Sequence, residues 1–277
     1  MTFTLQRHTT KALQTDRSRV QRPPCSRVSC RAMAAAGGTI TREVLSKAQR
    51  SKLDGTSDRQ FYAFPRLVKH VDDGFLAQVT QLYRERIQPG SVVLDLMSSW
   101  VSHLPPEVKY EKVLGHGLNA AELAKNKQMD SFFVRDLNAE PDGWALGDQS
   151  VDAVVCCVSV QYMQQPERVF AEVYRVLKPG GVFILTFSNR MFYDKAIAAW
   201  RDGTGYGRCQ LVKQYFQAVQ GYTEPEVMMQ VALPAAQQQG GGLAQLLPKQ
   251  LQQFFARASN DPFYAVLAYR NFKPDYS

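Results

Sequence analysis

Residues 148–190 read DQSVDAVVCCVSVQYMQQPERVFAEVYRVLKPGGVFILTFSNR and hold the strongest pattern in the chain. Val151–Val158 is a long apolar run rich in valine, which is typical of a strand buried on both faces. Pro166–Leu177 places its apolar residues on one helical face, and the following Lys-Pro-Gly-Gly ends that helix. Val182–Phe187 is a second apolar run. Together these three segments predict two parallel strands joined by a crossover helix.

The same alternation continues on both sides of this unit. Before it, the pattern predicts a helix at Asp73–Ile87, strands at Val92–Leu96, Val113–His116 and Phe132–Arg135, and a helix at Ala120–Asn126. After it come helices at Tyr193–Arg201 and Cys209–Val219, a strand near Glu226–Val231, and a closing strand, Phe263–Tyr269, expected at the sheet edge. Such alternation predicts an α/β fold with a doubly wound sheet and helices on both faces.

Polar residues follow the expected strands at their carboxyl ends, where open α/β sheets bind their ligands. Asp95 ends the first strand, and Gly115–Asn119 follow the second. Asp136–Asn138 follow the third strand, and Ser159–Tyr162 follow the fourth. We therefore expect one ligand site at this edge of the sheet.

The block 148–190, with its R-V-L-K-P-G-G terminus, resembles the class I S-adenosylmethionine-dependent methyltransferases, in particular the methyltransferase type 11 group. The resemblance extends over about residues 88–190. It implies a Rossmann-like sheet of seven strands whose last strand is antiparallel, and S-adenosyl-L-methionine as the cofactor. The closing run Phe263–Tyr269 is consistent with that last strand.

The loop after the first strand departs from this family. Where the family has Gly-Cys-Gly-Thr-Gly, this chain has Met97–Val101, which reads MSSWV. Glycine allows a positive φ and a close approach to the ligand, whereas a β-branched valine there would be strained. We expect a different backbone path, with the hydroxyls of Ser98 and Ser99 serving the cofactor's carboxylate or amine. The Ser-Ser-Trp loop resembles that of a methyltransferase-like subgroup from photosynthetic organisms and bacteria.

A second departure follows the second strand, where Gly117 occupies the position at which the family often has an acid for the ribose. The resemblance then assigns the ribose to Asn119, or as second choice to Glu122. It implies that Asp136 accepts from the adenine amino group and that the Leu137 N–H reaches a ring nitrogen. The expected cofactor-binding set is Asp95, Met97, Ser98, Ser99, Leu118, Asn119, Asp136, Leu137 and Ser159.

No catalytic triad is evident, and methyl transfer requires a general base only for weakly acidic nucleophiles. The weak candidates for a base are His70, His103 and Tyr162, with His116 as a further one. Tyr62, Arg66 and His70 share helical spacing and are candidates for a lid over the site. Four residues beyond the fifth strand are candidates for contacting the substrate: Arg190, Tyr193, Trp200 and Tyr206. Cys156, Cys157 and Cys209 lack the spacing of a zinc site, so no metal is expected.

The basic charge is concentrated in the first 38 residues. They contain seven basic residues and one acidic residue, so the remaining 26 basic and 24 acidic residues carry only +2. This acid-poor, Arg- and Ser-rich composition is typical of an organelle transit peptide. We expect a chloroplast transit peptide cleaved near Cys30, with a mitochondrial presequence as the alternative. The expected organisation is a leader over 1–38, a helical lid segment over 39–88, and a methyltransferase-like domain over 89–277 with a low-complexity insertion near 234–250.

The sequence thus predicts an S-adenosylmethionine-dependent methyltransferase acting on an unidentified small molecule in the plastid stroma. The alternative is a non-catalytic scaffold or assembly factor, which the missing glycines favour. A nicotinamide oxidoreductase is disfavoured because the G-x-G-x-x-G motif is absent. The near-neutral charge beyond the leader disfavours nucleic-acid binding. No apolar stretch approaches the roughly 18 residues of a membrane span, which leaves peripheral membrane contact and the oligomeric state open.

Overall fold

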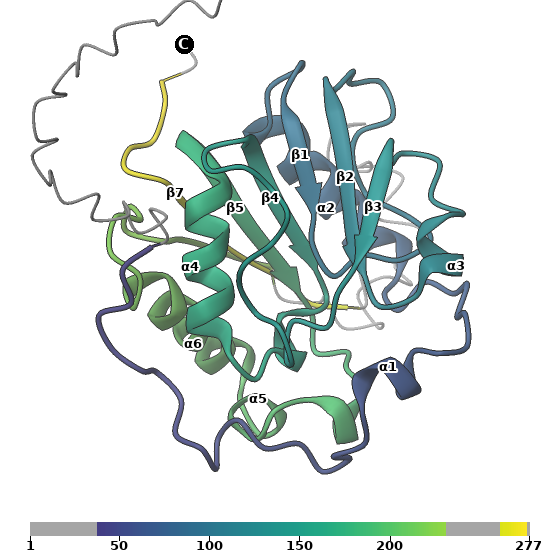
Figure 1. Cartoon of the computed structure of the whole chain (residues 1–277), viewed down its shortest axis with the longest axis vertical. Helices are drawn as coiled ribbons and strands as arrows, with labels where there is room; N and C mark the ends of the chain where they lie inside the picture. The colour runs from purple at the N-terminus through teal and green to yellow at the C-terminus, as the bar shows by residue number, and fades with distance from the viewer. Residues whose placement is uncertain (1–37, 231–260, 276–277) are drawn as a thin grey trace, which may run out of the picture. The chain divides into compact units, whose positions relative to one another are not determined.

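A computed structural model of the chain describes residues 38–230 and 261–275. Its sheet has seven strands in the order β3-β2-β1-β4-β5-β7-β6, and β7 is antiparallel to both of its neighbours. The other adjacent pairs are parallel (Figure 1). The strands are β1 (Val92–Asp95), β2 (Lys112–Gly117), β3 (Ser131–Val134), β4 (Val151–Cys157), β5 (Leu177–Phe187), β6 (Glu226–Gln230) and β7 (Phe263–Tyr269). The predicted seven-stranded, doubly wound sheet is confirmed.

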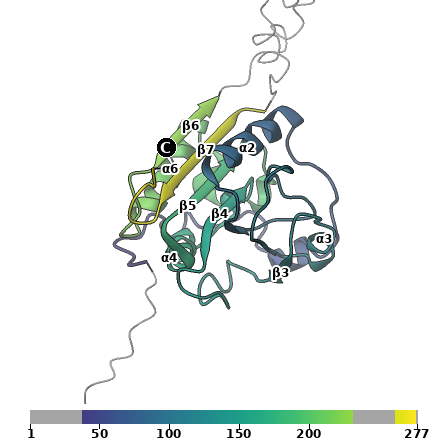
Figure 2. The same ribbon diagram turned by 90° about the horizontal axis from the view of Figure 1, so that it is seen from above.

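Helices cover both faces of this sheet, as Figures 1 and 2 show for α2 on one side and α4 and α6 on the other. The helices are α1 (Asp58–Phe61), α2 (Asp73–Arg86), α3 (Ala120–Leu123), α4 (Pro166–Val176), α5 (Ala198–Arg201) and α6 (Gly205–Gln217), with short 3₁₀ helices at Val160–Tyr162 and Tyr193–Lys195. Each face has its own apolar core: Phe75 and Val79 of α2 pack with one, and Val169 and Phe170 of α4 pack with the other.

The prediction that Phe263–Tyr269 lies at the sheet edge was wrong. This strand pairs with β5 on one side and with β6 on the other. Six of its seven residues are buried, as in a central strand, whereas β6 ends in the exposed residues Met229 and Gln230. A near-continuous apolar run indicates burial on both faces, and the more polar run indicates the edge.

Three predicted helices differ from those observed. The helix expected over Ala120–Asn126 ends at Leu123, and the one expected over Tyr193–Arg201 is split into a 3₁₀ turn and α5. The helix α6 begins four residues early, because the Thr204 hydroxyl accepts from the Gly207 N–H and caps it. At the start of α6, a capping side chain sets the boundary more than apolar spacing does.

The Lys-Pro-Gly-Gly segment belongs to the start of β5, directly after α4. Gly180 has a φ of +78°. A Cβ on Gly181 would lie 2.8 Å from the Lys178 carbonyl oxygen and 2.9 Å from that of Asp152. Only glycine fits here, so the tight entry into β5 requires this pair.

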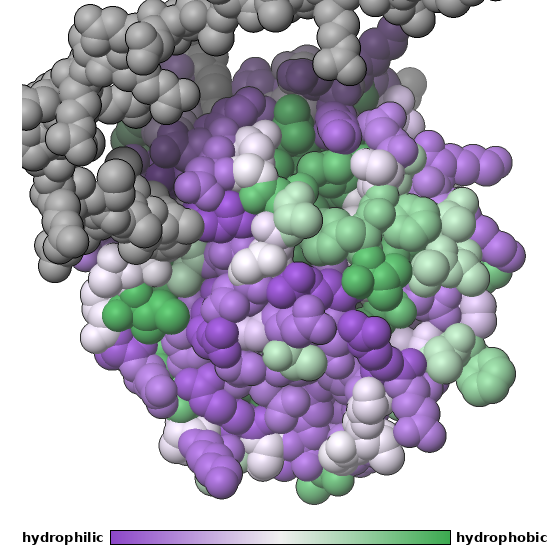
Figure 3. Space-filling model, viewed as in Figure 1, coloured by the Kyte–Doolittle hydropathy of each residue, from purple (hydrophilic) through white to green (hydrophobic). Residues whose placement is uncertain are grey.

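The leader, apart from Gly38, and the predicted insertion near 234–250 lie outside the described residues. Within the described residues, no helix combines the length and the hydropathy that crossing a bilayer requires. In Figure 3 apolar side chains gather over β1–β3, where no helix covers the sheet in this view. Val92, Leu114 and Phe133 of these strands are only partly buried against the core that α4 covers.

Candidate active site

The chain turns sharply after β1 although no glycine is present. Met97 has a φ of 55°, the left-handed conformation that glycine usually adopts. This conformation costs a non-glycine residue roughly 1–2 kcal/mol. The Met97 N–H donates to Nδ1 of His116 over 3.0 Å, and the Ser98 N–H donates to the His116 carbonyl over 2.6 Å. A histidine on the neighbouring strand thus stabilises the turn that glycine would otherwise permit.

The two hydrogen bonds of the His116 ring fix its protonation state. Because Nδ1 accepts from Met97, the proton is on Nε2, which donates to the Arg135 carbonyl over 2.9 Å. Burial lowers the pKa of His116 to about 4, so the ring is neutral at physiological pH. The ring connects the turn after β1 to the end of β3, which makes His116 a positioning residue and not a base.

The two departures from the family's pattern have a single steric cause. A Cβ on Gly117 would lie 2.5 Å from the Ser98 carbonyl oxygen and 3.3 Å from the side chain of Leu123. The acid that the family often places here therefore has no room, because the backbone of the serine loop occupies its space. In this chain, the path of the serine loop requires a glycine at the end of β2.

Asp95 organises the loop from behind and does not line the main cavity. Its carboxylate accepts from the hydroxyls of Ser98 and Ser102. Burial raises its pKa to about 6. It borders a smaller adjacent pocket of about 100 Å³, which Trp100 and His103 also line. Asp95 thus supports the loop from the adjacent pocket, and its predicted contact with the cofactor stays a prediction.

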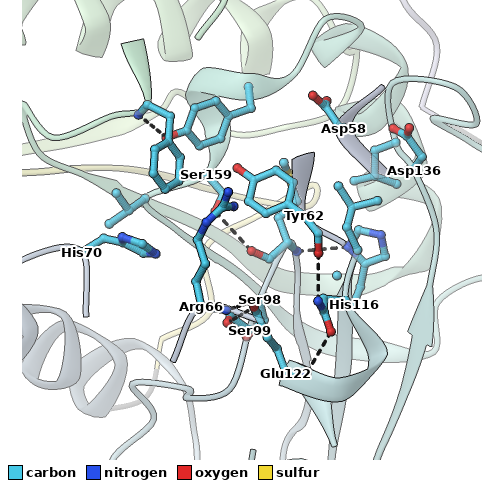
Figure 4. Close-up of a pocket in the computed structure, with 18 of the residues that line it drawn as sticks. Asp58, Tyr62, Arg66, His70, Ser98, Ser99, His116, Glu122, Asp136 and Ser159 are labelled. Carbon is cyan, nitrogen blue, oxygen red and sulfur yellow. Dashed lines mark hydrogen bonds between the residues drawn. The ribbon is translucent and has the colours of Figure 1, made fainter. Parts of the chain in front are cut away.

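The loops after the first five sequential strands meet around a cavity of about 260 Å³ (Figure 4). Residues 58–70 contribute the remaining wall through Asp58, Tyr62, Arg66 and His70. Eight of the nine predicted cofactor-binding residues line this cavity: Met97, Ser98, Ser99, Leu118, Asn119, Asp136, Leu137 and Ser159. The structure thus brings together in one place residues that are spread over 63 positions of sequence.

Asn119 is the residue predicted to hold the ribose, but its amide is already occupied. Its Oδ1 accepts from the N–H groups of Ala121 and Glu122 and caps α3. Its Nδ2 donates to the carbonyls of Tyr62 and Ala63 over 2.8 Å and 3.2 Å. Two acceptances and two donations use the full capacity of a side-chain amide. Asn119 positions the chain around the cavity and has no free donor for a ligand.

Glu122 lies beside Asn119 and retains unused acceptor capacity. One of its oxygens accepts from the Arg66 N–H over 2.6 Å, and the other accepts from the Ser99 hydroxyl. A carboxylate offers about four acceptor sites, so about two remain. The sequence analysis ranked Glu122 below Asn119 for the ribose, although the Asn-Ala-Ala-Glu pattern at 119–122 is a recognisable helix start.

Asp136 and Ser159 complete the polar lining. Oδ1 of Asp136 accepts from the Asn138 N–H over 2.9 Å, and the carboxylate is buried. The Ser159 hydroxyl donates to the Met97 carbonyl over 3.1 Å, so the loops after β1 and β4 hold each other. Val158 has a φ of 51°, which is rare for a β-branched residue. Strained backbone therefore occurs on both sides of this contact.

The three base candidates occupy different places. His70 is exposed at the cavity, and desolvation lowers its pKa. His103 lines only the smaller pocket, and burial lowers its pKa to about 4. Tyr162 lines the cavity, and its hydroxyl accepts from the Phe192 N–H over 2.8 Å. Burial raises the pKa of Tyr162, so this phenol stays protonated and can donate into the cavity.

Residues 61–72, here called the strap, close the cavity but are not helical beyond Phe61. The helical spacing expected for Tyr62, Arg66 and His70 was wrong, because Pro65 lacks an N–H and disfavours helical geometry in the residue before it, but all three side chains line the cavity. The strap is tied down by Asn119, by Glu122 and by Nε1 of Trp100, which donates to the Val68 carbonyl over 3.4 Å. Trp100 therefore anchors the strap from the smaller pocket.

Of the four residues proposed to contact the substrate, only Arg190 lines the cavity. Trp200 is buried in the core, and Tyr193 and Tyr206 are exposed elsewhere. Phe192 lines the cavity but was not among the predicted residues. The same holds for a buried cluster in which Asp58 pairs with Lys52 over 2.6 Å and with Lys195 over 3.5 Å. Asp58 and Lys195 are 137 positions apart and leave no local pattern, whereas Lys52 lies only six positions before Asp58. No group of three or more potential metal ligands occurs among the described residues.

Comparisons with known proteins bear on this site. Residues 106–185 match a family model described as a methyltransferase domain, of the type 11 group. The bifunctional biotin biosynthesis protein BioHC of Teredinibacter turnerae is 31% identical over 104 residues, which are 35% of this chain and 18% of that protein. The match thus spans less than a fifth of the curated relative's length.

Similar solved structures include a Haloferax volcanii methyltransferase in complex with the activator Trm112. It is 14% identical, with a TM-score of 0.47, and the match covers 74% of this chain and 92% of that one. Another is phosphoethanolamine N-methyltransferase 2 of Haemonchus contortus with S-adenosyl-L-methionine. It is 15% identical, with a TM-score of 0.45, and the match covers 72% of this chain and 52% of that one.

Proposed function

We propose that this chain, a class I S-adenosylmethionine-dependent methyltransferase of the type 11 group, transfers the methyl group to a small molecule in the plastid stroma. The observation that carries the proposal is the convergence of eight strand-end residues on one cavity. The plastid location rests on the composition of the first 38 residues, which contain seven basic residues and one acidic residue.

The cavity fits the cofactor by the chemistry of its lining. Hydroxyl and amino donors of an adenosine need acceptors, and the carboxylates of Glu122 and Asp136 face the cavity with acceptor capacity left over. We assign the ribose hydroxyls to Glu122 and the adenine amino group to Asp136. Leu118 and Leu137 supply apolar surface for the ring. The hydroxyl of Ser98 donates to Asp95, so its lone pairs remain free to accept from the cofactor's ammonium group.

When bound, S-adenosylmethionine would supply a methyl group on a sulfonium, whose carbon–sulfur bond would break with its electron pair left on sulfur as the acceptor's own electron pair formed the new bond to carbon. This chain contributes mainly by holding the two reactants in line and excluding water. The strap and Phe192 close one wall of the cavity, and the hydroxyl of Tyr162 lies in another. Tyr162 is positioned to donate a hydrogen bond to the acceptor, and an acidic acceptor atom needs no base.

The main argument for a non-catalytic scaffold was the loss of the loop glycines. The structure weakens that argument, because Met97 adopts the left-handed turn without glycine and His116 supports it. The substitution at Gly117 follows from the path of the serine loop and does not by itself indicate a lost cofactor.

Calorimetric titration of the full chain with S-adenosylhomocysteine tests the proposal. We expect binding at one site, and methyl transfer from radiolabelled S-adenosylmethionine to a small-molecule fraction of a plastid extract. The absence of binding up to millimolar ligand by correctly folded protein would contradict the proposal. Localisation of a fluorescent fusion of the first 38 residues tests the compartment separately.

A further inference from the structure

Arg66 of the strap reaches into the middle of the cavity (Figure 4). Its backbone N–H is held by Glu122 over 2.6 Å, which fixes where the side chain begins. Its guanidinium lies 4.3 Å from the centroid of the Phe61 ring and 5.5 Å from that of Phe192. Cation–π contacts of this kind hold a guanidinium in place but leave its N–H groups unused.

Nη1 of Arg66 is buried and has no hydrogen-bond partner among the described residues. A buried donor without an acceptor costs roughly 1–3 kcal/mol, and more when it is charged. The other arginines that line the cavity do have partners. Arg190 donates to Asp261 over 2.7 Å, and Arg135 donates to the carbonyls of Glu140 and Asp142. The cost at Arg66 is removed when a ligand supplies an acceptor.

The surroundings of Arg66 indicate the shape of that ligand. Phe61 and Phe192 lie 5.3 Å apart between centroids, and Tyr162 lies 6.2 Å from Phe192. The cavity-lining side chains Tyr62, Arg66, Tyr162 and Phe192, with Phe61 packed against the Arg66 guanidinium, are here called the aromatic half of the site. This half suits a flat apolar body that ends in a planar anion, because a guanidinium matches carboxylate geometry.

A carboxylate reaching Arg66 has two sources, the cofactor and the methyl acceptor. The groups that fit adenosine, Glu122 and Asp136, follow β2 and β3. The ring contacts of Arg66 come from the strap and from Phe192, which follows β5. The guanidinium therefore lies on the side of the cavity that the cofactor assignment leaves for the acceptor.

We propose that Arg66 binds the carboxylate of the methyl acceptor, so that the substrates of this enzyme are small carboxylic acids with an aromatic or flat apolar body. The inference rests on the proposed function, since it assigns the other half of the cavity to S-adenosylmethionine. In this arrangement Arg66 is a specificity-determining residue for the acceptor.

The experiment uses the full chain saturated with S-adenosylhomocysteine and titrated with benzoate or with neutral benzamide, followed by NMR. Wild-type protein is expected to bind benzoate at least about tenfold more tightly than benzamide, which corresponds to about 1.4 kcal/mol. The R66Q variant is expected to lose this preference and to retain the wild-type affinity for S-adenosylhomocysteine within twofold. The matched control is R168Q, a substitution of an exposed arginine on α4 that pairs with Asp142, and it should behave as wild type.

Three results would overturn the inference. One is a benzoate preference that survives in R66Q, and another is the absence of any preference in wild-type protein. The third is a tenfold loss of S-adenosylhomocysteine affinity in R66Q with benzoate binding intact, which would assign the guanidinium to the cofactor's carboxylate. Failure of wild-type protein to bind S-adenosylhomocysteine at all would overturn the proposed function, and this inference with it. Normal cofactor binding without a benzoate preference would overturn the inference alone.

Discussion

The cavity has two halves that differ in how their polar groups are satisfied. The first, here called the acidic half, consists of the Met97–Ser99 loop, Glu122 and Asp136, and its polar side chains are hydrogen-bonded to one another, to Asp95 or to backbone. In the aromatic half the guanidinium of Arg66 still lacks a partner for Nη1 among the described residues. The protein itself holds the polar side chains of the acidic half in place, whereas Nη1 of Arg66 in the aromatic half acquires an acceptor only from a ligand.

We expect the greatest loss of cofactor affinity from a substitution at Gly117, the closest contact in the acidic half. In G117A the new Cβ would lie 2.5 Å from the Ser98 carbonyl oxygen, so the serine loop must move. We expect calorimetry to show a loss of S-adenosylhomocysteine affinity of at least about 100-fold, or about 2.7 kcal/mol. The matched control is G147A, where the nearest atom is at 3.7 Å. Unchanged affinity in folded G117A would show that the loop does not contact the cofactor.

The second expected effect on cofactor affinity concerns Glu122, to which we assign the ribose. In E122Q one acceptor oxygen becomes a donor, while the size of the side chain is kept. We expect about a tenfold weaker binding of S-adenosylhomocysteine, close to the value of one charge-assisted hydrogen bond. E140Q, at a more exposed glutamate, serves as the control. An affinity within twofold of wild type would assign the ribose elsewhere.

Asp95 gives a pH-dependent effect on stability. Burial raises its folded pKa from 3.8 to about 6, so its contribution to stability is present below about pH 4 and is lost as the pH rises through about 6. The D95N variant lacks this ionisation. Its unfolding free energy relative to wild type should therefore rise by about 2–3 kcal/mol between pH 4 and pH 7.5.

Urea denaturation of both proteins at the two pH values measures this difference. The lowered pKa values of His103 and His116 make the unfolding free energy rise with pH, opposite to the effect of Asp95. Both proteins contain these histidines, so their contribution cancels in the difference. A difference between D95N and wild type that does not vary with pH would show that Asp95 does not titrate in this window.

The smallest change in unfolding free energy is expected from M97G, in the turn after β1. Met97 already has a φ of 55°, so M97G relieves strain while it loses partly buried side-chain contacts. These two changes offset, and we expect the unfolding free energy to change by less than about 1 kcal/mol. Cofactor affinity should stay within threefold of wild type.

The matched control for M97G is V101G, since Val101 is not among the described residues with a positive φ. Glycine there gains no relief of strain, so V101G should destabilise the protein more than M97G does. Equal losses in the two variants would mean that the left-handed turn at Met97 stores no strain.

The fold was predicted well because buried positions carry apolar residues at the regular spacing of strands and helices. The apolar run Val151–Val158 and the amphipathic segment Pro166–Leu177 correspond closely to β4 and α4. The position of β7 was missed although its nearly continuous apolar run indicated a central strand. The non-helical strap was not predicted, although Pro65 argues against a helix there. The helical spacing of Tyr62, Arg66 and His70 indicated the opposite.

The site was predictable in its location but not in its hydrogen bonds. Polar residues after strands indicated which loops converge, since strand ends of a parallel sheet share an edge. The Ser98 carbonyl leaves no room for a side chain at Gly117, which is 19 positions further along the chain. No local sequence pattern indicates such a contact. The role of Asn119 as a helix cap could be predicted from the local sequence. Its hydrogen bonds to the strap depend on tertiary contacts and could not.

The most direct test of the central claim is a crystal structure of the full chain with S-adenosylhomocysteine. We expect the ligand in the cavity at the ends of β1–β4, with its ribose hydroxyls on Glu122, its adenine amino group on Asp136, and its amino group at the Met97–Ser99 loop. Arg66 should remain free of the ligand's carboxylate. A ligand bound at another site, or one whose ribose contacts neither Glu122 nor the serine loop, would contradict the account.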